Sequence, residues 1–462
     1  MNKSDSERMA AYFEEQGMRE ETNKYKADVV VLTTCGVRQS AEDRVYGFVP
    51  RIKKENPSCF LILTGCLSER SDVKKRLEGK VDLWLPIGEI SSTKLQITNH
   101  KSQINSKSQI LNSKQDNCEY LELKAKYSSA FRAFVPIGNG CNNYCSYCVV
   151  PYARGREKYR QAEDIIKEVK DLVRKGYKEI TLIAQNVNSY LDIRHKTIDI
   201  RQYKFPNLIN DINKISGEFW LRFATSHPKD MSDKLIEAIA KCEKVCEHVH
   251  LPAQAGDNEV LKAMNRGYTI EHYIELINTL RKKINSRINR TINRTNDSRA
   301  YFALPLAITT DIIVGFPGET KEQFDNTVKL FKEVKFDMAY IAQYSPRPGT
   351  AAAKLKDDVP KQEKKRREEA LMEILRKTAL ENNKKYLGKT VEVLVEGKNR
   401  DGNWHGMTRT GKNVRIDDRR QTRPQRERSE AGAATDDRNL LGQFVSVKII
   451  KVSDFGMEGE LV

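Results

Sequence analysis

Apolar and polar positions in the first hundred residues alternate between short continuous apolar runs and helical patterns. A continuous apolar run is typical of a strand buried on both faces, and its alternation with helices predicts a parallel sheet. Two of these runs end at Cys35 and Cys66, which we therefore expect at the carboxyl edge of the sheet, where ligands gather. The predicted elements are a helix at 4–18, a strand at 27–35, a helix at 40–56 and strands at 60–66 and 81–85.

Strand-like and helical segments alternate again between residues 130 and 350. This repetition predicts a full or partial (β/α) barrel with its site at the carboxyl ends of the strands. A charged helix at 361–386 then leads to short alternating strands, which predict a small β-barrel near the end of the chain. The central strand candidates lie at 134–137, 179–184, 220–224, 248–251, 310–314 and 338–343.

Three polar, repetitive stretches interrupt these patterns, and their composition is typical of disordered linkers or insertions. They lie at 99–117, 283–298 and 417–438. The predicted fold class is α/β, with an N-terminal parallel α/β domain, a central partial (β/α) barrel and a C-terminal small β-barrel. The expected boundaries are 1–98, a linker at 99–125, then 126–385 and 386–462.

Charge and composition narrow the partners of this 462-residue chain. Its formal net charge of +17 favours an anionic partner, with nucleic acid as the first candidate. No apolar run approaches the roughly 20 residues of a membrane span, and the N-terminus lacks a secretory pattern. We therefore expect a cytoplasmic protein without a membrane partner, whose nine cysteines are reduced or bind metal.

The strongest chemical motif is a C-x3-C-x2-C spacing of Cys141, Cys145 and Cys148. Three thiolates on one loop can hold three corners of a 4Fe–4S cluster and leave the fourth iron open to a small molecule. A zinc site is the alternative, but it would need a fourth ligand, and the nearest histidines in the sequence are His100 and His195. The spacing resembles that of the radical S-adenosylmethionine (SAM) enzymes.

Further segments narrow this resemblance to the radical SAM methylthiotransferase family, and most closely to its tRNA-modifying branch. The segments 149–152 and 185–190 favour this branch over the one that modifies a ribosomal protein. The segments that carry the resemblance occur in one order along the chain, at 1–9, 33–38, 63–66, 148–155, 184–190, 222–228, 250–257, 264–268, 311–320 and 344–350.

The resemblance implies a transferase that adds a methylthio group to C2 of N6-isopentenyladenosine next to the anticodon of tRNA. It implies SAM and two 4Fe–4S clusters as cofactors, with the cysteine trio holding the radical cluster and Cys35 and Cys66 holding an auxiliary one. It also implies a TRAM-like RNA-binding tail, the tRNA anticodon loop as partner, and an electron donor such as flavodoxin or ferredoxin. We expect a monomer.

Polar or flexible residues that follow the barrel strands are candidates for binding SAM, and loop capping is the alternative role for each. No catalytic residue is assigned. Arg154 and Arg347 suit either an anionic ligand or a structural ion pair. The candidate cofactor-binding residues are Gln185, Ser226, Gln254, Gly315 and Glu319.

One departure from the family concerns the auxiliary cluster, which uses three cysteines in the family. The third lies just before the first helix, where this sequence begins with Met1 and Asn2. Either the start codon is placed late or the site has two cysteines, so an incomplete auxiliary cluster is possible. The missing cysteine leaves open a catalytically impaired tRNA-binding protein.

The family resemblance leaves open a second substrate, N6-threonylcarbamoyladenosine in tRNA. The two substrates would differ in the pocket for the N6 substituent, which is apolar for the isopentenyl group and charged for the threonyl carboxylate.

Overall fold

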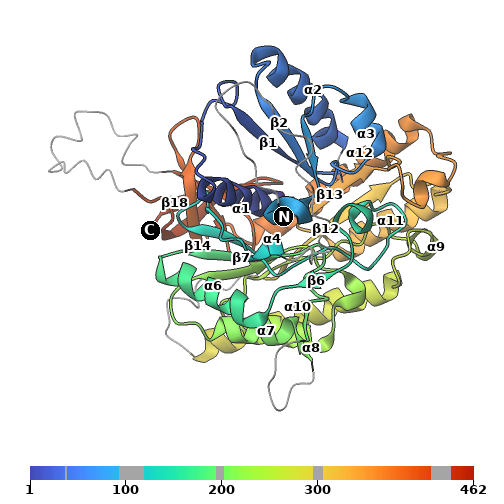
Figure 1. Cartoon of the computed structure of the whole chain (residues 1–462). Helices are drawn as coiled ribbons and strands as arrows, with labels where there is room; N and C mark the ends of the chain where they lie inside the picture. Colours follow the sequence, from blue (N-terminus) through green and yellow to red (C-terminus); the bar gives the residue numbers. More distant parts are fainter. Residues whose placement is uncertain (37–38, 93–118, 194–201, 295–304, 418–438) are drawn as a thin grey trace.

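The computed structural model consists of three sheet-based units (Figure 1). It describes residues 1–36, 39–92, 119–193, 202–294, 305–417 and 439–462. The insertion expected at 99–117 lies outside the described residues, as does all but the first residue of the one expected at 417–438.

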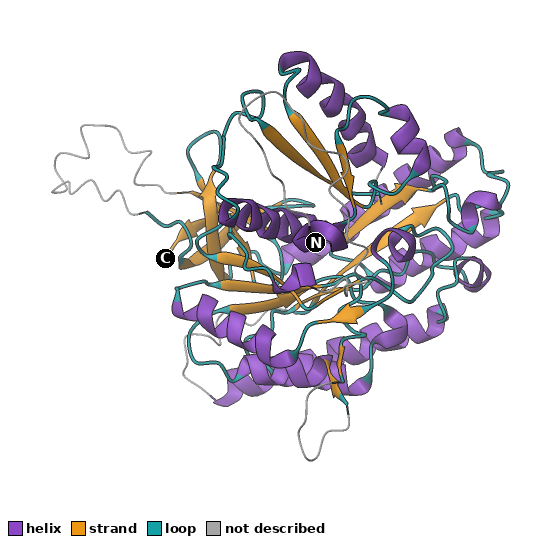
Figure 2. Cartoon of the chain, viewed as in Figure 1, coloured by secondary structure: helices purple, strands orange, loops and turns teal. Residues whose placement is uncertain are grey.

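The N-terminal unit is a parallel three-stranded sheet in the order β1-β2-β3, with helices on both faces (Figure 2). The middle strand is apolar at successive positions because both of its faces are buried. Ile62 packs with Met9 of the first helix, whereas Leu61 packs on the other face with Ile52 of the second helix. The elements are α1 (Asn2–Glu15), β1 (Val29–Thr34), α2 (Gln39–Glu55), β2 (Phe60–Gly65), α3 (Ser71–Arg76), β3 (Leu83–Leu85), η1 (Ile87–Ser92) and α4 (Glu119–Glu122).

The central unit is an arc of six parallel strands in chain order. The sheet β4-β7-β10 meets the sheet β11-β12-β13 through a parallel bridge between Leu221 and Val245. This order confirms the predicted partial (β/α) barrel. The main strands are β4 (Arg132–Pro136), β7 (Glu179–Ile183), β10 (Trp220–Phe223), β11 (His248–His250), β12 (Ala307–Val314) and β13 (Met338–Gln343).

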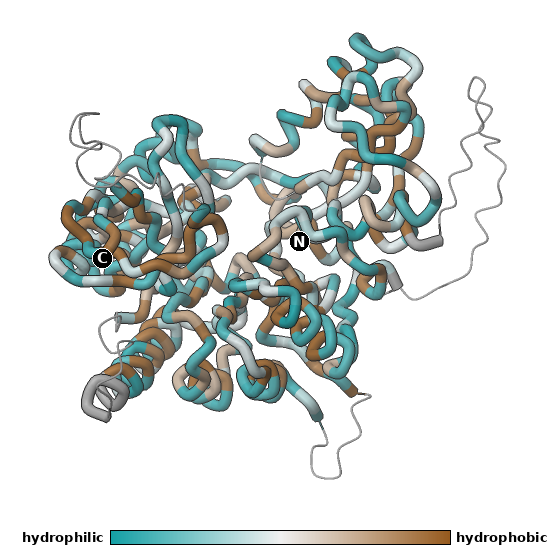
Figure 3. Tube along the Cα trace, turned by 90° about the vertical axis from the view of Figure 1, so that its left-hand side faces the viewer, coloured by the Kyte–Doolittle hydropathy of each residue, from teal (hydrophilic) through white to brown (hydrophobic). Residues whose placement is uncertain are grey.

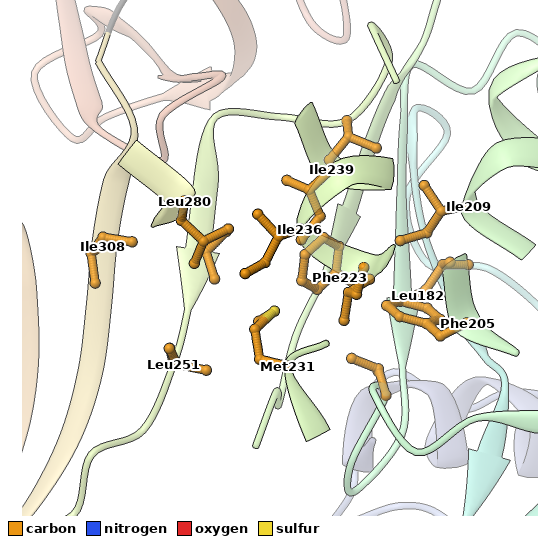
Figure 4. Close-up of a cluster of buried hydrophobic side chains, with 14 of the residues drawn as sticks. Leu182, Phe205, Ile209, Phe223, Met231, Ile236, Ile239, Leu251, Leu280 and Ile308 are labelled. Carbon is orange, nitrogen blue, oxygen red and sulfur yellow. The ribbon is translucent and has the colours of Figure 1, made fainter. Parts of the chain in front are cut away.

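Helices cover the outer side of this arc and enclose the largest core (Figure 4). Leu182 of β7 and Phe223 of β10 contribute to this core with Phe205 and Ile209 of α7. The helices of the unit are α5 (Val150–Arg154), α6 (Ala162–Arg174), α7 (Phe205–Asn213), α8 (Asp233–Lys241), α9 (Asn258–Ala263), α10 (Ile270–Arg294), α11 (Lys321–Val334) and α12 (Lys361–Lys384). The short elements are β5 (Gly138–Asn139), β6 (Lys158–Tyr159), β8 (Leu191–Asp192), β9 (Tyr203–Lys204), η2 (Pro228–Asp230) and η4 (Ala352–Lys354).

Helix α10 shows that the expected disordered insertion at 283–298 was wrong up to Arg294, where the helix ends. Ile284 is fully buried in the barrel core, and Ile288 packs against the same core. Together with Leu280 they recur every fourth residue, which places them on one face of a helix. The polar composition of this stretch concealed an apolar spacing that tertiary packing uses.

The C-terminal unit is a closed barrel of five strands, which confirms the predicted small β-barrel. Trp220, which begins β10, packs on Phe444 with 4.8 Å between ring centroids, and Arg409 pairs with Glu247 just before β11 at 2.8 Å. The C-terminal barrel therefore docks at the amino ends of the central strands. Hydrophobic and hydrophilic positions are interspersed along the folded trace, in helical coils as well as in extended segments (Figure 3). The strands are β14 (Thr390–Lys398), β15 (Trp404–Thr408), β16 (Asn413–Asp417), β17 (Phe444–Val452) and β18 (Met457–Leu461).

Candidate active site

The three closely spaced cysteines lie on the loop between β5 and α5, beyond the carboxyl end of the first barrel strand. Gly140 lets the chain enter this loop, because its φ is +83° and a Cβ there would lie 2.2 Å from the carbonyl oxygen of Arg156. Within the loop, the N–H of Cys148 donates to the carbonyl of Cys145 at 2.9 Å. The N–H of Cys141 donates to the carbonyl of Gly155 at 3.2 Å, and the three cysteines share one short, half-buried segment.

Burial sets the acid–base state of these thiols. It raises the pKa of Cys141 to about 11 and the pKa of Cys148 to about 12. Both are therefore protonated at neutral pH, and a metal centre must displace their protons to bind. No three His, Cys, Asp or Glu groups in the described ranges converge on the position of a single metal ion. A 4Fe–4S cluster takes one thiolate at each ligated iron, so three thiols on one loop match three of its irons in number.

The loop that follows α9 holds the cysteine loop in place. The N–H of Ser146 donates to the carbonyl of Met264 at 3.0 Å, and its hydroxyl donates to the carbonyl of Ala263 at 2.8 Å. Asn265 has a left-handed backbone with φ +57°, and its side-chain amide donates to the carbonyl of Tyr144 at 3.0 Å. The cysteine loop is thus fixed from outside as well as by its own turn.

The other cysteine pair lies at the carboxyl edge of the N-terminal sheet, where the apolar pattern predicts it. Cys35 follows β1 and Cys66 follows β2, the adjacent parallel strand. A Cβ on Gly36 would lie 3.1 Å from Cβ of Cys66 and 3.2 Å from Cγ2 of Val149, the residue after Cys148. Both groups of cysteines therefore face the junction between the N-terminal sheet and the barrel.

Two of the residues predicted to bind SAM place buried polar atoms at this end of the barrel. Gln185 follows β7 and Ser226 follows β10, and their Oε1 and Oγ atoms are buried without a hydrogen-bond partner. Buried polar atoms in folded proteins normally have partners, so these two are available to a ligand. The loop after β10 also reaches the cysteine loop, since Lys229 donates to the side chain of Asn143 at 2.7 Å.

The other three predicted residues shape the turns after β11 and β12. Gln254 has φ +71° and its N–H donates to the carbonyl of Asp311 at 2.9 Å. Gly315 has φ +69°, and its N–H donates to the carboxylate of Glu319 at 2.5 Å. That carboxylate, whose pKa is raised by burial, also binds Arg367 at 2.8 Å. Glu319 therefore holds the turn, and the side chain of Lys364 packs against it, since a Cβ on Gly315 would lie 2.4 Å from Cγ of Lys364.

Arg154 and Arg347 are engaged in ion pairs between the barrel and the N-terminal unit. Arg154 lies 2.6 Å from Asp5 of α1, and both side chains are almost fully buried. Arg347 donates to Gln39 at 2.7 Å and lies 3.3 Å from Glu42 of α2. Of the two roles left open by the sequence, the structure shows the structural ion pair.

The sequence analysis assigned no role to Arg266, Tyr268 or His227, which also lie at this site. Nη1 of Arg266 donates to Sγ of Cys145 at 3.3 Å, and Nε donates to the hydroxyl of Tyr268 at 3.2 Å. Burial lowers the pKa of His227 to about 2, with the positive charge of Arg266 as the next contribution, so this imidazole is neutral. The only signal for Arg266 and Tyr268 in the sequence was their place in the segment 264–268.

Comparisons with known proteins identify all three units. The family profile of the Radical SAM superfamily matches residues 135–331, the Uncharacterized protein family UPF0004 matches 1–86, and the TRAM domain matches 384–462. The tRNA-2-methylthio-N(6)-dimethylallyladenosine synthase of Clostridium novyi (strain NT) is 41% identical over 473 residues, which cover 100% of this chain and 94% of that protein. The chain belongs to this synthase family. Its radical SAM unit implies a 4Fe–4S cluster and SAM as cofactors.

A second synthase of the same name, from Thermoanaerobacter pseudethanolicus (strain ATCC 33223 / 39E), is 41% identical over 471 residues, with 100% of this chain and 90% of that protein covered. Resemblance to solved structures is more distant. The radical SAM methyltransferase TsrM from Kitasatospora setae is 13% identical with a TM-score of 0.44, covering 75% of this chain and 66% of that chain. Within the described ranges, no helix has the length and apolar composition that crossing a membrane requires.

Proposed function

We propose that this protein is a tRNA methylthiotransferase that adds a methylthio group to C2 of N6-isopentenyladenosine next to the anticodon. The observation that carries this proposal is the full-length similarity to synthases of that name, because it extends over all three units. The TRAM match and the net charge of +17 support binding of a polyanionic tRNA. The target base lies in a single-stranded loop, where it can be splayed out for reaction.

Cys141, Cys145 and Cys148 would hold the radical cluster. The support is their shared loop, which carries three separate thiols and is fixed by the residues after α9. When bound, the cluster and SAM supply the radical chemistry that removes hydrogen from C2 of the adenine. The protein's own part is to orient the reactants and to exclude water from them.

Gln185 and Ser226 would hydrogen-bond to SAM, since both carry a buried polar atom that lacks a partner. Gln254 and Gly315 would contact it through the turns that they form. Glu319 would not contact SAM itself. Its carboxylate accepts a hydrogen bond from the N–H of Gly315 and so stabilises the turn. No side chain is assigned to proton transfer.

Cys35 and Cys66 would hold the auxiliary cluster that the methylthio transfer requires. Their support is the shared sheet edge beside Val149, which brings this pair next to the radical loop. These two cysteines would supply two of the three ligands that the family uses. With tRNA as the proposed substrate, the proposed location is the cytoplasm. A flavodoxin or ferredoxin would donate the electron, and the chain would act as a monomer.

The test is an assay on anaerobically reconstituted protein with SAM, dithionite and tRNA that carries N6-isopentenyladenosine. Nucleosides are analysed by liquid chromatography and mass spectrometry, together with 5′-deoxyadenosine and the iron per chain. A Cys141→Ala/Cys145→Ala/Cys148→Ala variant should lose SAM cleavage. A Cys35→Ala/Cys66→Ala variant should keep SAM cleavage and lose methylthio insertion. Cys59→Ala is the matched control, because this buried thiol precedes β2 and lies at the opposite strand end from Cys66.

The parent should hold about eight irons per chain if two four-iron clusters assemble, and the triple variant about four. Methylthiolation of tRNA that carries N6-threonylcarbamoyladenosine, without product from the isopentenylated tRNA, would contradict the substrate. Retention of SAM cleavage by the triple variant would contradict the assignment of the radical cluster.

A further inference from the structure

The guanidinium of Arg266 lies directly against the cysteine loop. Its Nη1 donates to Sγ of Cys145 at 3.3 Å, its Nη2 to the carbonyl of Pro252 at 3.0 Å, and its Nε to the hydroxyl of Tyr268 at 3.2 Å. The residue is only 5% exposed. Each of the three guanidinium nitrogens has a partner, so the orientation of the group is set by the protein.

The neighbours of Arg266 are themselves fixed. The hydroxyl of Tyr268 donates to the carbonyl of Ala253 at 2.6 Å, and the guanidinium carbon lies 5.3 Å from the centroid of the Tyr268 ring. On the other side, Asn265 is hydrogen-bonded to the carbonyl of Tyr144 within the cysteine loop. The guanidinium and the thiol of Cys145 therefore keep their relative position.

This buried charge has no carboxylate partner. Among the residues that the structure describes, no Asp or Glu forms an ion pair with Arg266, whereas Arg154, Arg222 and Arg367 in the same unit each pair with one. A buried cation is costly unless an anion compensates it. The thiol of Cys145, which the guanidinium contacts, would supply negative charge there as a thiolate that binds a cluster.

We propose that Arg266 is a positioning residue that stabilises the reduced form of the cluster held by the cysteine loop, which rests on the proposed assignment of Cys145 as a ligand. Reduction adds one electron from the donor to the cluster and makes it more negative. A fixed positive charge and an N–H···S hydrogen bond favour that state, and both raise the reduction potential. Arg266 thereby brings the cluster closer to the potential at which the donor can reduce it.

The experiment uses anaerobically reconstituted protein that carries Cys35→Ala/Cys66→Ala. In this background only the cluster of the cysteine loop is titrated. Arg266→Gln removes the charge but keeps an N–H donor, and Arg266→Lys keeps the charge. Arg281→Gln is the matched control, because Arg281 is a partly buried barrel arginine whose guanidinium donates to the carbonyl of Val334 at 2.6 Å. Iron per chain is measured first, and the midpoint potential is then measured by redox titration followed by electron paramagnetic resonance.

Arg266→Gln should have a more negative midpoint potential than the background protein, Arg266→Lys should lie closer to it, and Arg281→Gln should equal it. An unchanged midpoint potential in Arg266→Gln at full iron content overturns the inference and leaves the ligand assignment intact. An equal shift of the midpoint potential in Arg266→Lys and Arg266→Gln has the same consequence. If Arg266→Gln holds no iron, Arg266→Lys decides, and a markedly more negative potential there overturns the inference. A background protein without a cluster overturns the ligand assignment together with the inference.

Discussion

Substituting Arg154 by Met tests whether the buried ion pair with Asp5 holds helix α1 on the barrel. Nη2 of Arg154 lies 2.6 Å from Oδ2 of Asp5, with 2% and 1% of the two side chains exposed. Nη1 also donates to the side chain of Asn139 at 3.1 Å. Removing the guanidinium takes away the ion-pair partner of the buried Asp5 carboxylate, which costs about 3–5 kcal/mol.

The assay is hydrogen exchange of the α1 amides followed by mass spectrometry, because it reports local opening in a protein of several units. A loss of about 3–5 kcal/mol corresponds to exchange about 10²- to 10⁴-fold faster, at 1.36 kcal/mol per factor of ten. The double variant Asp5→Asn/Arg154→Met should recover part of this loss, since neither charge of the buried pair remains without the other. Arg174→Met is the control, because its ion pair with Asp171 is exposed and contributes at most about 1 kcal/mol.

Exchange of α1 at the parent rate in Arg154→Met would refute this reasoning. So would a double variant whose loss equals the sum of the two single losses, because the two charges would then be energetically independent.

Two further predictions concern the barrel. His227→Asn should flatten the pH dependence of the free energy of unfolding between pH 6.5 and 5: the folded imidazole stays neutral down to pH about 2, whereas the unfolded one binds a proton below its ordinary pKa. In the parent, His227 therefore does not lower the free energy of unfolding above pH 6.5. Below that pH the free energy of unfolding falls by up to about 1.36 kcal/mol per pH unit, because only the unfolded state binds the proton. Ile284→Ala should lower the free energy of unfolding by about 2–5 kcal/mol, because Ile284 is fully buried in the core.

Denaturant titrations that follow unfolding of the central barrel measure the free energy of unfolding for both predictions. Equal slopes of stability against pH in the parent and His227→Asn would contradict the first prediction. Asn285→Ala, an exposed change in the same helix, is the control for the second and should shift stability by at most about 0.5 kcal/mol. Equal losses in Ile284→Ala and Asn285→Ala would show that this part of α10 does not pack on the core.

Much of the fold was predictable, because strands of a sheet that is covered on both faces are apolar at successive positions. The runs ending near Cys35 and Cys66 became parallel neighbours, and the strands at 179–184 and 220–224 lie within a residue of their predicted ends. Helix ends were less exact, and α1 occupies Asn2–Glu15 rather than 4–18. Helix ends fray and often finish in a 3₁₀ turn, so a local pattern defines them less exactly.

A prediction from composition was wrong where only a few apolar residues of a polar segment pack against the core. The stretch 283–298 was predicted to be an insertion, yet Ile284 and Ile288 attach α10 to the core as far as Arg294. A count of polar residues takes no account of this spacing, which has meaning only against a surface that accepts it.

The sequence by itself determined which residues share a strand, which cysteines share a loop, and which family the motifs resemble, because these properties depend on spacing along the chain. Only the tertiary structure decided that Arg154 pairs with Asp5, that Arg266 lies against Cys145, and that the C-terminal barrel docks at the amino ends of the central strands. Each of these contacts joins residues separated by more than a hundred positions. No local pattern encodes such contacts, since they form only when packed elements bring distant side chains together.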